Sequence, residues 1–155
     1  MNAISPTASM IDIKTWYRNH GDVTYNAYME LPTETQNKIL EYISRMPLSV
    51  ELTVNEKTYI LVHGAPSELK YRMSLSHIPD IEFSTWVRLK ANEIMPKGKI
   101  VIFGHTPTDD YQLDIPLKIW FADDKIGIDC GSGYNHPAYR LSCLRLDDLQ
   151  EFYSD

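Results

Sequence analysis

The sequence contains little of what marks several common classes of protein. Its two cysteines, Cys130 and Cys143, are too few for a disulfide framework and lack the C-x-x-C spacing of a metal or redox site. No apolar run approaches the length needed to cross a bilayer. The first residues also lack the basic segment and apolar core of a signal peptide. We therefore expect a cytoplasmic protein without a membrane partner.

Positive charge is scarce as well. The chain carries a formal net charge of −6, and its Lys and Arg residues form no cluster. Binding to a phosphate backbone depends on such basic patches, because Lys and Arg neutralise the phosphates. Nucleic acid is therefore not expected as a partner.

What is present is an ordinary globular composition. The chain has 155 residues, of which 43% are hydrophobic and 23% are charged. A chain of this size buries roughly two-thirds of the surface that its unfolded form exposes. It has no internal repeat, low-complexity tract or long linker. We therefore expect residues 1–155 to form a single domain.

Hydrophobic spacing and turn residues predict a mixture of helices and strands. The predicted helices run from Ser5-Pro6-Thr7 to Asn19, from Thr33 to Met46 and from Asp80 to Ile94. The predicted strands cover residues 50–54, 58–62, 100–103, 117–121, 125–130 and 141–146. Residues 147–155 form an acidic tail after the last of them.

Two of these strands are followed closely by a histidine. The strand 58–62 is followed by His63-Gly64, and the strand 100–103 by Gly104-His105-Thr106-Pro107. Open α/β sheets bind their ligands at the carboxyl ends of the strands. Neighbouring strands would bring both imidazoles to one edge, where they can bind a metal or transfer a proton. The alternative is that each is a turn histidine.

The predicted helix from Asp80 carries two further features. Trp86 and Val87 lie on its apolar face and are expected in the core. Arg88 lies beside that face, either as a solvated helix charge or as a clamp for an anion. Asp109 and Asp110 suggest a metal site, but a solvated loop is favoured because nothing fixes their geometry.

Together these motifs resemble the carboxyl-terminal half of the calcineurin-like metallophosphoesterases. The nearest branch comprises the bacterial serine/threonine protein phosphatases and the symmetrical diadenosine-tetraphosphate hydrolases. The motifs that carry the resemblance are Trp16 to Thr24, Val62-His63-Gly64, Trp86-Val87-Arg88, Phe103 to Pro107, Ile128 to Tyr134 and Leu141 to Leu144. The family usually has threonine at the position of Cys130. The resemblance implies an α/β/β/α sandwich.

The chain lacks other motifs of that family. An Asp-x-His, a Gly-Asp-x-x-Asp-Arg and a Gly-Asn-His-Glu are all missing. The resemblance implies that His63 and His105 bind the second of two divalent cations, which lie about 3.5–4 Å apart and activate a water. These would be Mn, Fe, Zn or Ni. It also implies that Arg88 holds a phosphoryl oxygen of a phosphorylated protein or nucleotide. The ligands of the first metal and the acid–base histidine have no counterpart.

The chain is therefore expected to be an incomplete phosphatase that needs a missing N-terminal half. The alternatives are a non-catalytic module that binds phosphate or docks a protein, and an inactive truncated remnant. A missing half would leave apolar side chains of the sheet exposed, which promotes a homodimer. The side chains expected there are Tyr59, Ile100, Ile102, Trp120 and Phe121.

Overall fold

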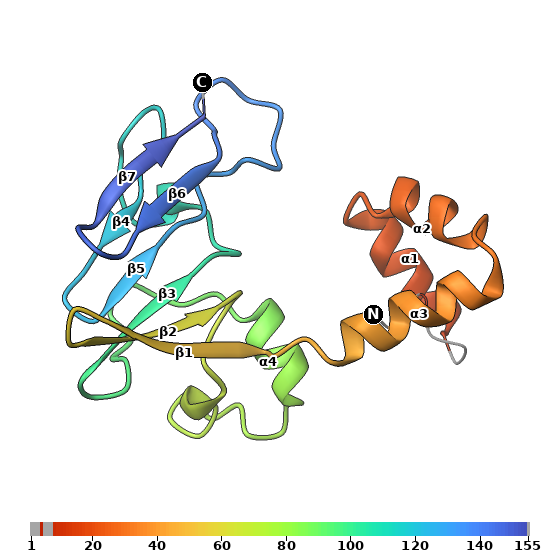
Figure 1. The fold of residues 1–155 in the computed structure, drawn as a ribbon, viewed down its shortest axis with the longest axis horizontal. Helices are drawn as coiled ribbons and strands as arrows, with labels where there is room; N and C mark the ends of the chain where they lie inside the picture. The colour runs from red at the N-terminus through yellow and green to blue at the C-terminus, as the bar shows by residue number, and fades with distance from the viewer. Residues whose placement is uncertain (1–3, 5–7, 155) are drawn as a thin grey trace. The chain divides into compact units, whose positions relative to one another are not determined.

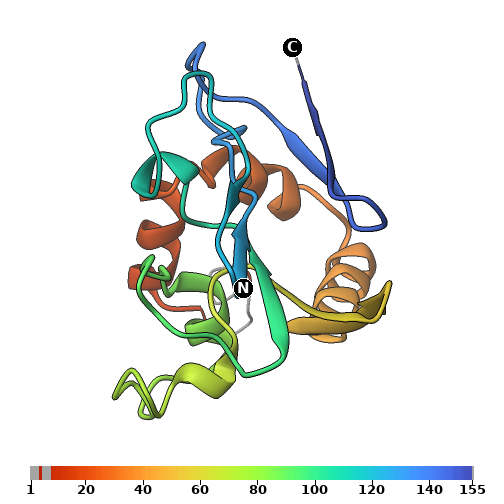
Figure 2. The same ribbon diagram turned by 90° about the vertical axis from the view of Figure 1, so that its left-hand side faces the viewer.

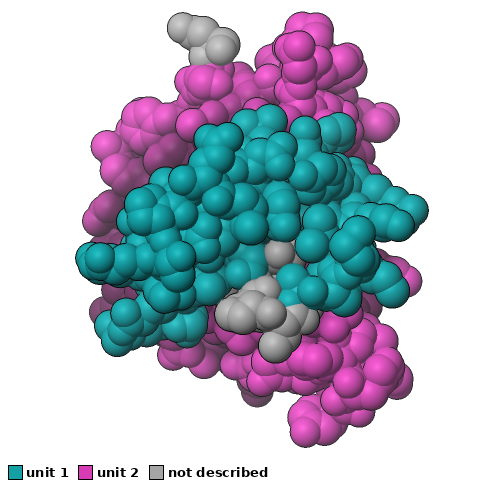
Figure 3. All heavy atoms as spheres, turned by 90° about the vertical axis from the view of Figure 1, so that its right-hand side faces the viewer, with its two compact units in different colours: residues 1–46 teal, residues 47–155 magenta. Residues whose placement is uncertain are grey.

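A computed structural model of the chain describes Ile4 and residues 8–154. The contacts within the chain divide it into two compact units, Met1–Met46 and Pro47–Asp155, which are coloured separately in Figure 3. Each unit is described by itself below, and the single domain expected from the sequence stays a prediction. In the part of the chain that the structure describes, no helix is both long and apolar enough to cross a membrane.

The first unit is built from three helices, α1 (Met10–Arg18), α2 (Asp22–Met29) and α3 (Thr33–Ser44). Ser9 caps α1, because its hydroxyl accepts a hydrogen bond from the Asp12 backbone N–H while the Asp12 carboxylate accepts from the Ser9 N–H. The predicted start of this helix at residues 5–7 lies outside the described residues. The prediction of α3 is confirmed. The sequence analysis predicts no helix at α2, because its N-cap is Gly21, and glycine after a helical segment is typical of a helix end.

The second unit contains a five-stranded mixed sheet in the order β1-β2-β3-β5-β4 (Figure 1). The strands are β1 (Ser49–Val54), β2 (Lys57–Val62), β3 (Lys99–Phe103), β4 (Trp120–Phe121) and β5 (Lys125–Gly127). Strands β2, β3 and β5 are parallel, whereas β1 and β4 run antiparallel to their neighbours as hairpin partners. The prediction of an α/β fold is confirmed.

The prediction of an acidic tail at residues 147–155 is wrong in part, because four of these residues form a strand. Strand β7 (Gln150–Tyr153) pairs antiparallel with β6 (Ser142–Arg145) in a separate two-stranded sheet. The turn between them is closed by Arg145, whose Nε donates to Asp148 Oδ1 at 2.8 Å. The sequence signal was weak because the four acidic residues of 147–155 masked a short strand.

The helix predicted from Asp80 to Ile94 is also wrong in its length. Helix α4 (Asp80–Trp86) ends where Val87 adopts an extended conformation with φ −74° and ψ 126°. The chain beyond it brings Leu89 and Met95 into the core, which a continuous helix would not allow. Tertiary packing therefore overrides the helical spacing of the sequence.

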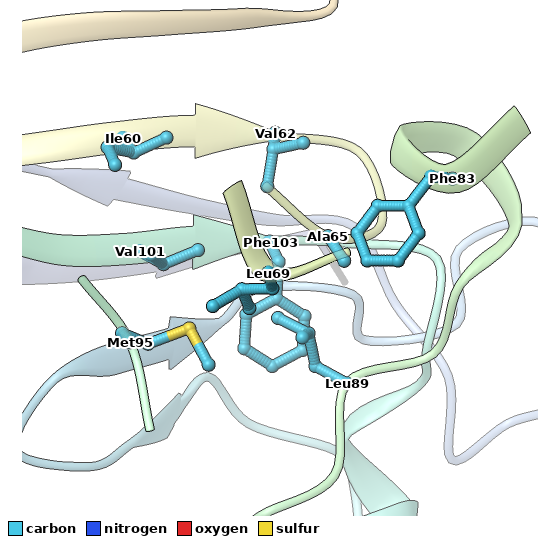
Figure 4. Packing of buried hydrophobic residues seen from close by; sticks show 9 residues of the cluster. All are labelled: Ile60, Val62, Ala65, Leu69, Phe83, Leu89, Met95, Val101 and Phe103. Atoms are coloured by element: carbon cyan, nitrogen blue, oxygen red, sulfur yellow. The ribbon is translucent and has the colours of Figure 1, made fainter. Parts of the chain in front are cut away.

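One face of the sheet packs against the segment that contains α4. The buried cluster on this face joins side chains of β2 and β3 to those of the loops and helices between them (Figure 4). It consists of Ile60, Val62, Ala65, Leu69, Phe83, Leu89, Met95, Val101 and Phe103. The cluster fixes α4 beside the carboxyl ends of β2 and β3.

The opposite face of the sheet is covered by the chain itself. The β6–β7 hairpin lies on this side (Figure 2), and its residues Leu144 and Tyr153 pack against the buried cluster there. The predicted exposure of Tyr59 and Ile102 is therefore wrong, since they are only 1% and 5% exposed. Phe121 is exposed, as predicted. The other two side chains of that prediction, Ile100 and Trp120, are half-buried.

Candidate functional site

The two strand-end histidines lie side by side. Strands β2 and β3 are parallel, and Val62 pairs with Phe103 at their carboxyl ends. His63 follows directly and His105 follows after Gly104, so both side chains leave the sheet at the same edge. Their ring centroids are 5.0 Å apart, with the ring planes inclined at 53°. This juxtaposition is what the sequence predicted.

Backbone hydrogen bonds tie the two turns to each other. The Gly104 N–H donates to the His63 carbonyl at 2.9 Å, directly across the gap between the strands. On the other side, the Gly64 N–H donates to the carbonyl of Ser84 near the end of α4 at 2.7 Å. A side chain at Gly64 would not fit, because a Cβ there would lie 2.8 Å from the Val87 carbonyl oxygen. The close approach of α4 to the site therefore requires glycine at this position.

The end of α4 and the residues that follow it contribute two more side chains to the site. The Arg88 Nη1 donates to the His105 carbonyl at 3.0 Å. The Trp86 ring meets the His105 ring edge to face, with centroids 5.7 Å apart. Trp86 is 55% exposed, so its predicted place in the core is wrong. The helix ends at this residue, and the indole lies against the His105 ring rather than in the buried cluster.

Trp86 is the functional candidate that sequence reasoning missed. The motif Trp86-Val87-Arg88 makes Arg88 a candidate, and the same motif contains Trp86. Helical spacing assigned the indole to the core, because the early end of α4 is not visible in the sequence. A tryptophan two residues before a candidate anion ligand was the available signal.

The surroundings of His105 favour its neutral form. Burial lowers the pKa of His105 below its usual value, and the positive charges of Arg88 and His63 lower it further. The backbone of Trp86 and the carboxylate of Asp129 act in the opposite direction, without reversing the effect. A neutral imidazole is the form that binds a metal ion. His105 is therefore suited to act as a ligand at neutral pH.

Two imidazoles alone do not complete a metal site. Within Ile4 and residues 8–154, no group of three or more His, Cys, Asp or Glu side chains is arranged to hold an ion. Asp109 and Asp110 are both exposed in the short 3-10 helix Thr108–Asp110, as expected of solvated side chains. The Asp109 carboxylate accepts a hydrogen bond from the Tyr139 hydroxyl at 3.0 Å. The donor set therefore fits part of a transition-metal site and lacks the carboxylates that would complete it.

Comparisons with known proteins add no family assignment. No protein-family model matches this chain, and no curated protein matches it. The resemblance to the metallophosphoesterases therefore rests on the sequence motifs alone.

Proposed function

We propose that this chain supplies two imidazole ligands, His63 and His105, to a metal centre that hydrolyses phosphoesters. The observation that carries the proposal is the 5.0 Å separation of the two rings at the ends of adjacent parallel strands. At this spacing, both rings can contribute a nitrogen to one cation lying between them. The remaining ligands would have to come from a second polypeptide segment, because the described residues place no third His, Cys, Asp or Glu ligand with the pair.

The chemistry of the donors supports a transition metal. Neutral imidazoles suit Mn, Fe, Zn or Ni, with carboxylates completing the shell. In phosphoester hydrolases, a pair of such cations lowers the pKa of a bound water and stabilises the attacking and leaving oxygens. No step of that reaction is assigned to the two histidines alone, because their donor set is incomplete.

Arg88 supports a phosphorylated substrate, either a protein or a nucleotide. Its side chain is exposed at the edge of the histidine pair, and one of its five N–H donors is occupied by the His105 carbonyl. The remaining donors match the geometry of phosphoryl oxygens. Arg88 thus adds positive charge where the substrate phosphate would lie.

The proposal is tested by binding of inorganic phosphate to the full chain with and without Mn²⁺, measured by calorimetry. We expect phosphate binding to require the metal and to be lost in His63→Ala and His105→Ala. His77→Ala is the matched control, because it removes another exposed imidazole that lies outside the pair. Hydrolysis of p-nitrophenyl phosphate by the chain alone is expected to be slow, and full activity would contradict the need for further ligands.

The incomplete donor set favours one alternative, a non-catalytic module that binds phosphate or docks a protein. In that case, phosphate would bind without metal, and its binding would persist in both His63→Ala and His105→Ala. The same calorimetric series therefore separates the two functions.

A further inference from the structure

We infer that Arg88 is a positioning residue, which holds the strained turn that aims the His105 imidazole at His63. Any binding of a cation by the two aligned rings rests on the proposed function. The alignment of the His63 and His105 rings is independent of that function, because it is a property of the metal-free chain. Arg88 therefore acts on the pair through the backbone as well as by its charge.

The backbone at His105 is unusual. Its φ is +62°, in the left-handed region that side chains with a Cβ seldom adopt. The Thr106 N–H also donates to the Gly104 carbonyl at 2.6 Å, which closes a three-residue turn with His105 at its apex. A turn of this size with a positive central φ is rare and strained. Such conformations persist only where surrounding contacts hold them.

The contacts that hold this turn lie on both of its flanks and at its apex. On one flank, the Gly104 N–H donates to the His63 carbonyl at 2.9 Å. On the other flank, the Thr108 backbone N–H donates to the Asp129 carbonyl at 2.9 Å. At the apex, the carbonyl of His105 itself accepts from Arg88 Nη1 at 3.0 Å. The apex bond fixes the orientation of the His105 peptide, and with it the direction of the side chain.

Arg88 is in turn anchored to the strand that carries His63. It lies two residues after α4, and the Ser84 carbonyl near the end of α4 accepts from the Gly64 N–H at 2.7 Å. The arginine therefore spans from the element fixed beside His63 to the turn that carries His105. This connection explains how one guanidinium can set the relation between the two rings.

The test compares Arg88→Ala, Arg88→Lys and wild type by NMR, using the full chain without metal. We expect Arg88→Ala to lose the cross-relaxation between the His63 and His105 ring protons and to shift the backbone amides of the turn. Lysine retains a donor at this position, so Arg88→Lys is expected to restore part of that signal. Arg72→Ala is the matched control, because Arg72 Nη1 also donates to a backbone carbonyl, that of Ile94, at 2.9 Å.

Unchanged ring contacts and amide shifts in Arg88→Ala would overturn the inference. A similar loss in Arg72→Ala would also overturn it, since the effect would then not be specific to the His105 turn. If neither phosphate nor metal binds the wild-type chain, the proposed function is contradicted. The inference about Arg88 is unaffected by that result, because the ring contacts are measured without phosphate or metal.

Discussion

The two histidines of the site differ in their surroundings, although both follow parallel strands. His63 is exposed, whereas His105 is half-buried and lies against Trp86 and Arg88. Burial lowers the pKa of His105. A single edge of the sheet therefore presents one exposed imidazole beside one that is held in place and has a lowered pKa.

Tyr153 gives the clearest pH dependence at the scale of single residues. Burial, aided by a hydrogen bond to Glu151, raises the pKa of Tyr153 to about 12. Because the folded pKa exceeds the unfolded value of 10.0, the stabilisation is complete below pH 10 and is lost as pH rises toward 12. We expect the free energy of unfolding of Tyr153→Phe to fall less than that of wild type between pH 10 and pH 12, as measured by urea unfolding.

Tyr71→Phe is the control for that series. Tyr71 is 82% exposed, so its removal is expected to leave the pH dependence of wild type unchanged. If Tyr153→Phe also follows the wild-type curve, the buried phenol does not contribute as described.

Lys125 is a buried charge with two partners. It is 3% exposed, and its Nζ donates to the Glu93 carbonyl at 2.6 Å and to Asp124 Oδ1 at 2.8 Å. Breaking a fully buried pair costs roughly 3–5 kcal/mol. Because the Asp124 side chain is 33% exposed, we expect Lys125→Met to lower the free energy of unfolding by about 2 kcal/mol. Urea denaturation provides the measurement.

Lys118→Met serves as the comparison. Its ion pair with Asp114 spans 3.9 Å between side chains that are about half exposed, so the expected loss is below about 1 kcal/mol. Equal losses in the two variants would show that burial does not set the contribution of Lys125.

At the scale of elements, the approach of α4 to the end of β2 builds the site. Gly64 allows this approach, since a Cβ would lie 2.8 Å from the Val87 carbonyl oxygen and 3.1 Å from that of Ser84. We expect Gly64→Ala to lower the free energy of unfolding by about 1–3 kcal/mol, because the two backbones must separate. The ring contact between His63 and His105 should weaken with it, measured by NMR cross-relaxation.

Gly133→Ala is the matched glycine substitution. A Cβ at Gly133 meets no atom within 4 Å and its φ is not positive, so the expected change stays within about 0.5 kcal/mol. A Gly64→Ala protein as stable as Gly133→Ala would mean that α4 can move away at little cost.

The sequence was sufficient to predict the strands that carry the site, but not the positions of Trp86 and Arg88 beside their ends. Buried β-branched runs ending in His63 and in Gly104-His105 identify β2 and β3, because continuous apolar strands alternate with turn residues there. The position of Trp86 was missed, because the end of α4 depends on the burial of Leu89 rather than on a breaker residue. The contact between Arg88 and the His105 carbonyl likewise depends on tertiary structure.

At the scale of the whole molecule, the two units differ in how much they bury. In the first unit, Tyr28 and Gly21 are the buried residues among those described. Both hydrophobic clusters belong to the second unit. The candidate site also lies entirely within residues 47–155, so the second unit contains both the buried core and the site.

This difference predicts how fragments behave. We expect residues 47–155 to unfold cooperatively and to keep the ring contact between His63 and His105, measured by circular dichroism and NMR. Residues 1–46 alone are expected to show weak helicity without a cooperative transition, since a chain of about this length rarely forms a sufficient core. A cooperatively folded first fragment together with an unfolded second one would contradict this division.

The account depends most on His63 and His105 sharing one cation. The most direct measurement is a Zn²⁺ titration of the full chain, monitored through the ring signals of its five histidines by NMR. The account predicts that the signals of His63 and His105 shift together with one apparent affinity, and that His63→Ala abolishes the shift of His105. Independent shifts of the two rings, or stronger binding at His77 or His136, would contradict it.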